Sequence, residues 1–319
     1  MPTIAITGAT GFVGSALFQA LRANPKYTVK GLCRTLPKEG VTEGLLALGN
    51  LESADFSQAL VGVDVVIHTA ARAHVLKEEA SNPLRAFRKV NVDGTLQLAR
   101  QAIEADVKRF VFISSIGVNG GSTQGVPFSE ADAPKPHTSY AQSKLEAEQA
   151  LKHLCKQAGM ELVIIRPPLI YAAHAPGNFA LLLKVVSKQL PLPFGSVKNQ
   201  RSFIALENIV DFIIQCVEHP QAANQTFVVA DDGTISTPQL LKLLAQDMGK
   251  KIFLLPVPVK LMELGAKLLG REAMFEQLCG SLEVDITKAK TLLSWQPPVS
   301  TAQAMQQTAQ HFLSSQLKK

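Results

Sequence analysis

Residues 3–14 read Thr-Ile-Ala-Ile-Thr-Gly-Ala-Thr-Gly-Phe-Val-Gly, so a β-branched apolar run passes directly into three glycines, Gly8, Gly11 and Gly14. This order predicts a strand, a tight turn and a helix. Glycines at such a turn let the backbone approach a pyrophosphate closely, and the free N–H groups of the following helix favour a negative charge. The stretch therefore predicts a dinucleotide-binding turn, the alternative being a tight turn with only a structural role.

Short apolar runs alternate with longer amphipathic stretches through the first half of the chain, which is typical of βαβ units and a parallel sheet. We expect strands at Thr3–Thr7, Thr28–Cys33, Asp64–Thr69, Arg109–Ser114 and Glu161–Arg166, with a weaker strand at Leu45–Gly49. We expect helices at Phe12–Ala23, Ser53–Leu60, Asn82–Ala105 and Ser139–Lys156, the last beginning with Ser139 and Gln142 in capping-box spacing.

After Arg166, frequent prolines divide the chain into shorter elements, including strands at Phe203–Leu206 and Thr226–Ala230 and a helix at Glu207–Glu218. The sequence thus predicts an α/β fold, a doubly wound parallel-sheet Rossmann fold with a smaller C-terminal substrate-binding region. We assign residues 1–166 and 200–230 to the dinucleotide-binding domain. Residues 167–199 and 231–319 form the predicted substrate-binding region, which should cover the carboxyl edge of the sheet.

The charge balance favours a small anionic ligand over a nucleic acid. There are 32 basic and 26 acidic residues, a net charge of +6, but the basic residues are scattered without a stripe or interleaved aromatics. The four cysteines are far apart and lack metal-ligand spacing, so we expect no metal site and no disulfide framework. No leader pattern and no long uncharged apolar stretch is present, so we expect a cytoplasmic protein without membrane insertion.

Tyr140 and Lys144 lie four residues apart, so a helix presents both on one face. A free tyrosine has a pKa near 10, and acid–base work around neutral pH requires a shift of roughly three units, which a neighbouring ammonium can supply in part. Ser115 follows the predicted strand Arg109–Ser114 at the carboxyl edge, where a hydroxyl can hydrogen-bond a reacting oxygen. These residues predict hydride-transfer chemistry with an acid–base pair, although an exposed helix face and a strand-end serine are the simpler alternatives.

Arg34 stands at the end of the second predicted strand, where NAD-binding folds usually place an acidic residue on the ribose 2′-hydroxyl. An arginine suits a 2′-phosphate instead, so we favour NADP(H) over NAD(H) as the cofactor, unless Arg34 is a solvated surface residue. Asn50, at the end of the weak strand, is placed to face the adenine.

Together these motifs resemble the extended short-chain dehydrogenase/reductase superfamily, in the NAD-dependent epimerase/dehydratase branch that acts on nucleotide sugars. The resemblance spans most of the chain. It rests on the glycine loop, His68-Thr-Ala-Ala71, Asn91-Val-Asp-Gly-Thr95, Ser114-Ser115, Tyr140-x-x-x-Lys144, Arg166-Pro-Pro-Leu-Ile-Tyr171 and Lys288-Ala-Lys-Thr-Leu-Leu-Ser-Trp295.

The resemblance implies a role for each matching residue. Ser115, Tyr140 and Lys144 are the implied catalytic residues, and Ser115, Asn178 and Arg201 the implied substrate residues, with Arg201 on a nucleotide diphosphate. The implied cofactor residues are Gly8, Gly11, Phe12, Val13, Gly14, Arg34, Asn50, Leu51, Ala70, Ala71, Asn91, Ser114, Tyr140, Lys144, Pro167 and Leu169. The resemblance also implies a homodimer through the long helices.

Departures from the family pattern narrow the reaction. Ile116 and Gly117 stand where the sugar 4,6-dehydratases have an Asp-Glu pair, so dehydration lacks its proton carriers. The second arginine that epimerases place near the C-terminal Asp-x-x-Lys-Ala segment is missing before Asp285. The run Ala70–Val75, the tail Gly280–Asp285 and Arg34 are instead similar to reductases of UDP-4-keto-6-deoxy-N-acetylhexosamines.

We therefore predict an NAD(P)-dependent oxidoreductase that transfers a hydride at C4 of a nucleotide-diphosphate sugar, most simply a UDP-4-keto-6-deoxy-N-acetylhexosamine reductase. The alternative is a UDP-sugar 4-epimerase that acts on UDP-glucose or UDP-N-acetylglucosamine with a tightly bound NAD, and a remoter one is a non-catalytic dinucleotide-sensing protein. Arg72 and His74 are candidates to reach the substrate, with a surface role as their alternative. The amphipathic segment Val259–Leu269 holds few basic residues, so we interpret it as a lid helix over the sugar and not as a membrane-surface helix.

Overall fold

The computed structural model describes residues 1–40, 42–73 and 82–317. A parallel sheet has the order β3-β2-β1-β4-β5-β6-β9, and β7 and β8 form a separate parallel pair. The strands of the large sheet are β1 (Thr3–Thr7), β2 (Thr28–Cys33), β3 (Leu45–Ala47), β4 (Val65–His68), β5 (Arg109–Ile113), β6 (Glu161–Arg166) and β9 (Thr226–Val228). The predicted doubly wound α/β fold is confirmed.

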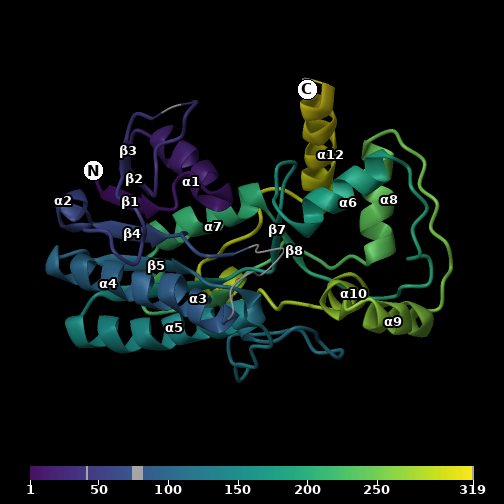
Figure 1. Ribbon diagram of the computed structural model, residues 1–319. Coiled ribbons are helices and arrows are strands. Elements are labelled where there is room, and N and C mark those ends of the chain that lie inside the picture. The colour runs from purple at the N-terminus through teal and green to yellow at the C-terminus, as the bar shows by residue number, and fades with distance from the viewer. Residues whose placement is uncertain (41, 74–81, 318–319) are drawn as a thin grey trace.

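Helices cover both faces of the large sheet and build a second lobe beside it (Figure 1). The helices are α1 (Phe12–Arg22), α2 (Ser57–Leu60), α3 (Pro83–Arg88), α4 (Thr95–Glu104), α5 (Ser139–Ala158), α6 (Asn178–Ser187), α7 (Leu206–Glu218), α8 (Thr237–Asp247), α9 (Val259–Leu268), α10 (Glu272–Cys279), α11 (Thr287–Leu292) and α12 (Thr301–Leu317). None of these described helices is long and apolar enough to cross a membrane.

Alternation along the buried strands divides the core into two layers. In β5, Val111 packs on the side of α1 and α7, whereas Phe110 and Phe112 pack on the side of α2, α4 and α5. A third apolar cluster joins α6, α8 and α12 to β7 (Leu169–Tyr171) and β8 (Phe203–Ala205). The second lobe therefore has a core of its own next to the carboxyl edge of the sheet. The division of the chain into two domains with the boundaries given above stays a prediction.

The predicted single helix over Asn82–Ala105 was wrong in its middle. A π-helix over Lys89–Gly94 separates α3 from α4. The Thr95 hydroxyl donates to the Asn91 carbonyl at 2.8 Å, and the Asn91 side chain bonds outside its helix. A π-turn of this kind widens the helix so that a side chain can serve another segment, which sequence periodicity does not reveal.

Two helix starts also differ from the expectation. Residues 53–56 precede the helix, which covers only Ser57–Leu60. The Asp55 carboxylate accepts from the Ser57 N–H at 2.9 Å just before it. Thr138 and not Ser139 caps α5, accepting from the Ala141 N–H at 3.1 Å. The first correction halves the helix predicted over Ser53–Leu60, and the second leaves the start of α5 at Ser139 as predicted.

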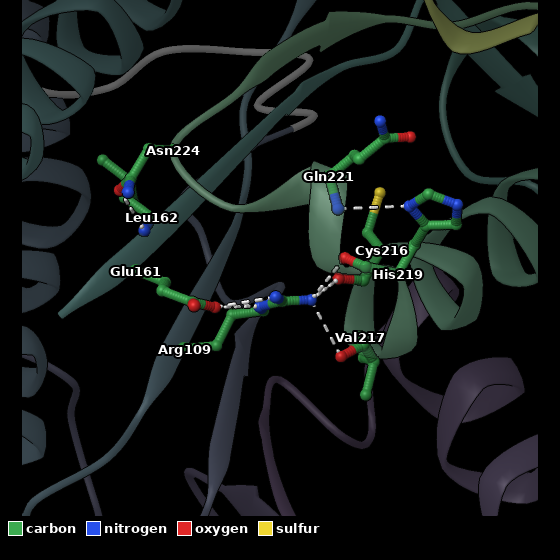
Figure 2. Close-up of polar contacts among 8 residues, drawn as sticks. All are labelled: Arg109, Glu161, Leu162, Cys216, Val217, His219, Gln221 and Asn224. Atoms are coloured by element: carbon green, nitrogen blue, oxygen red, sulfur yellow. Dashed lines mark hydrogen bonds and ion pairs between the residues drawn. The ribbon is translucent and has the colours of Figure 1, made fainter. Parts of the chain in front are cut away.

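Arg109, at the amino end of β5, fastens α7 to the sheet (Figure 2). One guanidinium nitrogen donates to the carbonyls of Cys216, Val217 and His219 at 2.7, 3.0 and 3.0 Å. Another donates to the Glu161 carboxylate at 2.7 Å. The last carbonyls of a helix have no partner within the helix, so a buried cation at that end both caps them and suits the helix dipole.

Candidate active site

The glycine loop has a shape that only glycines permit. Gly8 has a φ of +72°, and a Cβ there would come within 2.8 Å of the Ala70 nitrogen. A Cβ on Gly14 would lie 2.1 Å from the Gly8 carbonyl oxygen, and the Gly11 N–H donates to that same oxygen at 2.8 Å. No side chain of the described residues caps the start of α1. The loop thus fits a dinucleotide pyrophosphate, because its backbone is bare and the uncapped start of α1 offers free N–H groups.

Phe12 and Val13 open α1 directly after the loop, and both pack partly against the core on the α1 side. The Phe12 ring also meets the His174 ring edge-on, with centroids 5.2 Å apart. The predicted loop residues therefore lie together at the carboxyl end of β1.

The end of β4 comes next to this loop and is held by Asn91. The Asn91 side chain accepts from the Arg72 N–H at 2.8 Å and donates to the Arg72 carbonyl at 3.2 Å. It also donates to the Ser143 hydroxyl of α5 at 3.0 Å. Asn91 is fully buried and so fixes the segment that contains Ala70 and Ala71 against α5. Asn91 was predicted to line the cofactor, and in the structure its side chain positions the backbone at Arg72.

His68, at the end of β4, is a structural residue. Its Nε2 lies 2.9 Å from the Thr95 hydroxyl and its Nδ1 lies 2.6 Å from the Thr7 hydroxyl. The Thr95 hydroxyl donates to the Asn91 carbonyl, so it accepts from the ring, and the Nε2 nitrogen carries the proton. Complete burial and, to a smaller extent, the charge of Lys144 lower the pKa of His68 to about 3. The imidazole is therefore neutral and supports the π-turn.

Tyr140 and Lys144 lie on the first two turns of α5. The Lys144 ammonium donates to the Ile113 carbonyl at 2.8 Å and stands 4.5 Å from the Phe112 ring centroid and 6.0 Å from the Tyr140 ring centroid. The Phe87 ring meets the Tyr140 ring edge-on at 6.0 Å between centroids. The predicted acid–base pair is therefore gathered at one place, with Lys144 buried.

Burial shifts the acidity of both groups. Desolvation raises the pKa of Tyr140 to about 12. Desolvation lowers the pKa of Lys144 to about 7, against the opposing attraction of Glu148. The phenol is therefore protonated at neutral pH, and it can give up its proton only when additional positive charge is placed beside it. The bound nicotinamide of an oxidised dinucleotide carries such a charge.

Ser115 follows β5 and caps the short 3-10 helix Ile116–Val118. Its hydroxyl oxygen accepts from the Gly117 N–H at 3.1 Å, which leaves the hydroxyl hydrogen for another acceptor. The neighbouring Ile116 N–H donates to the Pro167 carbonyl at 2.9 Å, so the ends of β5 and β6 are tied together. This arrangement suits the predicted contact between Ser115 and a substrate oxygen.

A buried ionic network lies behind these residues, and sequence reasoning missed it. Glu148 is one turn beyond Lys144 and accepts from Arg166 at 2.5 and 2.9 Å and from the Ser114 hydroxyl at 2.5 Å. Arg166 also donates to Asn119 at 3.0 Å. The signal was the spacing of four residues between Lys144 and Glu148, together with an arginine at the end of an apolar strand. Ser114 thus reaches Glu148 with its side chain.

The predicted contacts to the adenosine half lie at the other end of the carboxyl edge. Arg34 follows β2 and is exposed, and Asn50 is exposed just beyond β3. Leu51 packs against Gly94 of the π-turn, where a Cβ would come within 2.8 Å of the leucine side chain. On the opposite side, Pro167 is buried after β6 and Leu169 is 39% exposed at the start of β7.

Asn178 and Arg201, the predicted substrate residues, both meet α10 and the turn after it. The Asn178 amide donates to Gln277 at 2.6 Å. Arg201 donates to the Gly280 carbonyl at 2.8 Å. Burial lowers the pKa of Arg201 to about 10, so the guanidinium is still a cation at neutral pH. The structure therefore brings both residues to one segment of the second lobe.

Arg72 and His74 follow β4. The Arg72 guanidinium carbon stands 5.4 Å from the Phe87 ring centroid, on the ring that meets Tyr140. His74 lies outside the described residues. Which of the residues above contact cofactor or substrate stays a prediction.

The family model described as "NAD dependent epimerase/dehydratase family" matches residues 4–230. The chain belongs to this family. It is also 44% identical over 315 residues to a UDP-glucose 4-epimerase of Vibrio cholerae, covering 98% of this chain and 95% of the relative. The expectation of an NAD-dependent enzyme of the extended short-chain dehydrogenase/reductase type is confirmed.

Two further similarities are more distant. An N-acetyl-alpha-D-glucosaminyl-diphospho-ditrans,octacis-undecaprenol 4-epimerase of Escherichia coli O157:H7 is 26% identical, covering 97% of this chain and 94% of the relative. The crystal structure of a UDP-glucose 4-epimerase from Thermotoga maritima with UDP-glucose superimposes with a TM-score of 0.77 at 23% identity, covering 99% of each chain. The Thermotoga maritima structure shows the shared fold. The Vibrio cholerae and Escherichia coli relatives favour the epimerase alternative over the reductase that we predicted first.

Proposed function

We propose that the chain is a UDP-sugar 4-epimerase that retains NAD through each turnover. The observation that carries this proposal is the 44% identity, over 98% of the chain, to a UDP-glucose 4-epimerase. The gathering of Tyr140, Lys144 and Ser115 at the carboxyl edge of the sheet supports it, because epimerisation at C4 requires one proton to leave an oxygen and return.

The chain's own residues would carry the proton and hold the reacting oxygen. Tyr140 would accept the proton of the C4 hydroxyl and return it to the same oxygen once the opposite face of the C4 carbonyl has been reduced, while Ser115 donates a hydrogen bond to that oxygen. Lys144 stabilises the phenolate by its charge. The chemistry that a bound nicotinamide dinucleotide would supply is reversible hydride acceptance, by which C4 would be oxidised and then reduced again. Lys144 is only 2% exposed, so its cationic form acts strongly on Tyr140, but burial also lowers the pKa of Lys144 to about 7, so that this form is only partly populated at neutral pH.

The side chains next to Ser115 argue against dehydration. Ile116 is 5% exposed and packs with Val228 and Leu282, and Gly117 has no side chain. Neither position can supply the acid or base that removal of water from the sugar requires. The proposal is therefore limited to reactions that change C4 by hydride and proton transfer.

The substrate proposal rests on charge and on the relatives. Arg201 is a partly desolvated cation, and such a group binds a diphosphate more strongly than an exposed one does. We propose UDP-glucose and UDP-N-acetylglucosamine as substrates, the second because the Escherichia coli relative is named for an N-acetylglucosaminyl group.

The cofactor and setting complete the proposal. The family is NAD dependent. A preference for NADP(H) rests only on Arg34, so this preference is proposed and tested separately from the reaction. We also propose a cytoplasmic location, since all four cysteines are free thiols and three of them are buried. The homodimer stays a prediction.

The proposal is tested with the purified chain and UDP-glucose or UDP-N-acetylglucosamine, without added cofactor and then with NAD. The C4 epimers are separated chromatographically while absorbance at the NADH band is followed. We expect conversion to the epimer without net change in absorbance, and we expect Tyr140→Phe to abolish it. Stoichiometric oxidation of NADPH with a UDP-4-keto-6-deoxy-N-acetylhexosamine, and no epimerisation, would establish the reductase instead.

A further inference from the structure

Phe87 is a buried aromatic residue of α3 that lies outside the apolar core. It is 8% exposed, yet it belongs to none of the apolar clusters that the described residues form. A buried phenylalanine removes a large apolar area from water, and it usually does so among other core side chains. The groups that Phe87 contacts in place of a core therefore indicate its role.

Two groups beside the candidate site contact the Phe87 ring. The Tyr140 ring meets it edge-on, with centroids 6.0 Å apart and the ring planes inclined by 65°. The Arg72 guanidinium carbon lies 5.4 Å from the Phe87 centroid. Aromatic pairs favour an edge-on arrangement over a parallel sandwich, and a cation is attracted to the face of a ring. Phe87 thus joins the predicted proton carrier to the segment that follows β4.

Helix α3 is fixed to α5 close to this contact. The two helices pack against each other, as can be followed in Figure 1. Arg88 donates to the two carboxylate oxygens of Glu146 at 2.7 and 2.6 Å, and Gln142 donates to the same carboxylate at 2.9 Å. The Phe87 ring is therefore held against the first turn of α5 by its own helix.

The backbone of Tyr140 is connected to the same group of residues. Its carbonyl accepts from the Ser143 hydroxyl at 2.7 Å, and that hydroxyl accepts from the Asn91 amide at 3.0 Å. Asn91 also bonds the backbone of Arg72, as described above. The contacts form a closed circuit of Tyr140, Phe87, Arg72, Asn91 and Ser143. A side chain supported in this way by packing and by hydrogen bonds has little freedom to change its rotamer.

The place of the Tyr140 hydroxyl depends on this support. Within residues 1–40, 42–73 and 82–317, no group hydrogen-bonds to that hydroxyl, so ring packing and the backbone place it. Proton transfer requires the two oxygens within about 2.6–3.2 Å of each other, and a misplacement of about 1 Å can lower a rate on the order of 10²-fold. We propose that Phe87 is a positioning residue that holds the Tyr140 phenol where it meets the substrate oxygen.

This role of Phe87 rests on the proposed function, in which Tyr140 carries the proton of the C4 reaction. An epimerase uses the same phenol before and after the sugar turns over, so the phenol has to keep its place while the sugar changes its orientation. Phe87 acts through Tyr140 and not on the sugar. Its loss should therefore lower the turnover number and leave the KM for the UDP-sugar nearly unchanged.

The test compares Phe87→Leu with Phe18→Leu. Phe18 is the matched control, because it is 6% exposed and the Arg22 guanidinium carbon lies 5.5 Å from its ring centroid, but it packs within the core on the α1 side. We expect Phe87→Leu to lower turnover about tenfold, and Phe18→Leu to keep it. Phe87→Tyr retains the ring and should recover most of the turnover. Melting temperatures of the three variants show that each is folded.

A second measurement does not depend on the reaction. The chain has three tyrosines, so NMR with isotope-labelled tyrosine rings gives three sets of signals, and Tyr140→Phe identifies those of Tyr140. Without the ring current of Phe87, the Tyr140 signals should shift in Phe87→Leu, whereas those of Tyr27 and Tyr171 should stay in place. The Tyr140 signals should not move in Phe18→Leu.

Three outcomes would overturn the role of Phe87. The first is unaltered turnover in Phe87→Leu, the second is an equal loss in Phe18→Leu, and the third is a Tyr140 signal that stays in place when the Phe87 ring is removed. Failure of the proposed function gives a different result, because the unaltered chain then leaves UDP-sugars unchanged while the Tyr140 signals still shift. The turnover comparison is in that case made on the NADPH-dependent reduction of a UDP-4-keto-6-deoxy-N-acetylhexosamine, which uses the same phenol.

Discussion

Arg109 begins β5 at the amino edge of the sheet, and Arg166 ends β6 at the carboxyl edge. Both are buried and both pair with a glutamate. Arg109 donates three hydrogen bonds to main-chain carbonyls at the end of α7, and the side chain of its partner Glu161 is 41% exposed. Arg166 bonds only side chains, among them Glu148, which is 1% exposed.

The difference shows that the arginine at the amino edge of the sheet serves stability, whereas the arginine at the carboxyl edge also positions the residues of the candidate site. At the amino edge, the Arg109 guanidinium caps the C-terminal end of α7. Its acceptors there are backbone carbonyls, which do not depend on the identity of the residues that carry them. At the carboxyl edge, the cation holds Glu148 and Asn119, which belong to the segments that also carry Lys144 and Ser115. Ligands bind at the carboxyl edge of open α/β sheets, so the side-chain network lies where geometry matters most.

The largest effect is expected from Tyr140→Phe, which removes one hydroxyl at the carboxyl edge. Loss of the proton carrier should lower turnover by about 10²- to 10⁴-fold, because general acid–base catalysis contributes that much. Dinucleotide binding, measured by fluorescence titration, and the melting temperature should not change. An unaltered rate would remove Tyr140 from the proposed mechanism.

The difference between the two arginines is tested by comparing the stability and the turnover number of Arg166→Met with those of Arg109→Met. Replacing Arg166 leaves Glu148 buried and unpaired, so we expect a loss of about 3–5 kcal/mol in the free energy of unfolding and a lower turnover number. Replacing Arg109 should cost about 1–3 kcal/mol, because its acceptors are neutral carbonyls and Glu161 reaches solvent, and the turnover number should stay unchanged.

Denaturant unfolding and steady-state rates of the two variants provide the measurement. The double variant Arg166→Met/Glu148→Leu should recover much of the stability, since it leaves no unpaired buried charge. The account would be contradicted if Arg109→Met lowered turnover more than Arg166→Met did.

The acidity of Tyr140 should depend on the redox state of the bound dinucleotide. The pKa of all three tyrosines is raised in the chain, that of Tyr140 to about 12 and those of Tyr27 and Tyr171 still higher. The positive ring of NAD⁺ should lower the pKa of Tyr140 by about one to three units, whereas NADH should not. Ultraviolet difference spectra of phenolate between about pH 8 and 11.5 would show this, with Tyr140→Phe as the control. Identical titrations with NAD⁺ and NADH would contradict it.

The smallest effect concerns Arg34, at the far end of the carboxyl edge. If Arg34 recognises a 2′-phosphate, Arg34→Ala should weaken NADP binding about tenfold and leave NAD binding nearly unchanged. Dissociation constants of both dinucleotides for both proteins would measure it. Equal losses for NAD and NADP, or none, would show that Arg34 does not select the cofactor.

The fold was predictable where the pattern is local. Continuous apolar strands such as Glu161–Arg166 and the glycine loop showed the sheet and its βα order, since both faces of these strands are covered. The pairing of β7 with β8 was not predicted, because strands of three residues give no period. The π-turn at Lys89–Gly94 was also missed, because it depends on what the Asn91 side chain bonds in a distant loop.

The catalytic motif of the site was predictable from the sequence, but the buried side chains that hold this motif in place were not. The spacing of Tyr140 and Lys144 is visible in the sequence. Glu148 and Arg166 form their ion pair only after β6 and α5 pack together, which the sequence does not show. Single residues and identity over the whole chain favour different reactions. Arg34 and the missing second arginine favoured a reductase, whereas identity over the whole chain favours an epimerase.

The most direct test of the proposed epimerase follows the hydrogen on C4. The chain, loaded with NAD, is given UDP-glucose that carries deuterium at C4, and the epimer is examined by mass spectrometry and NMR. The account predicts that the epimer keeps the deuterium at C4, because the same hydride returns to the carbon that it left. Formation of the epimer with protium at C4, or no epimer at all, would contradict it.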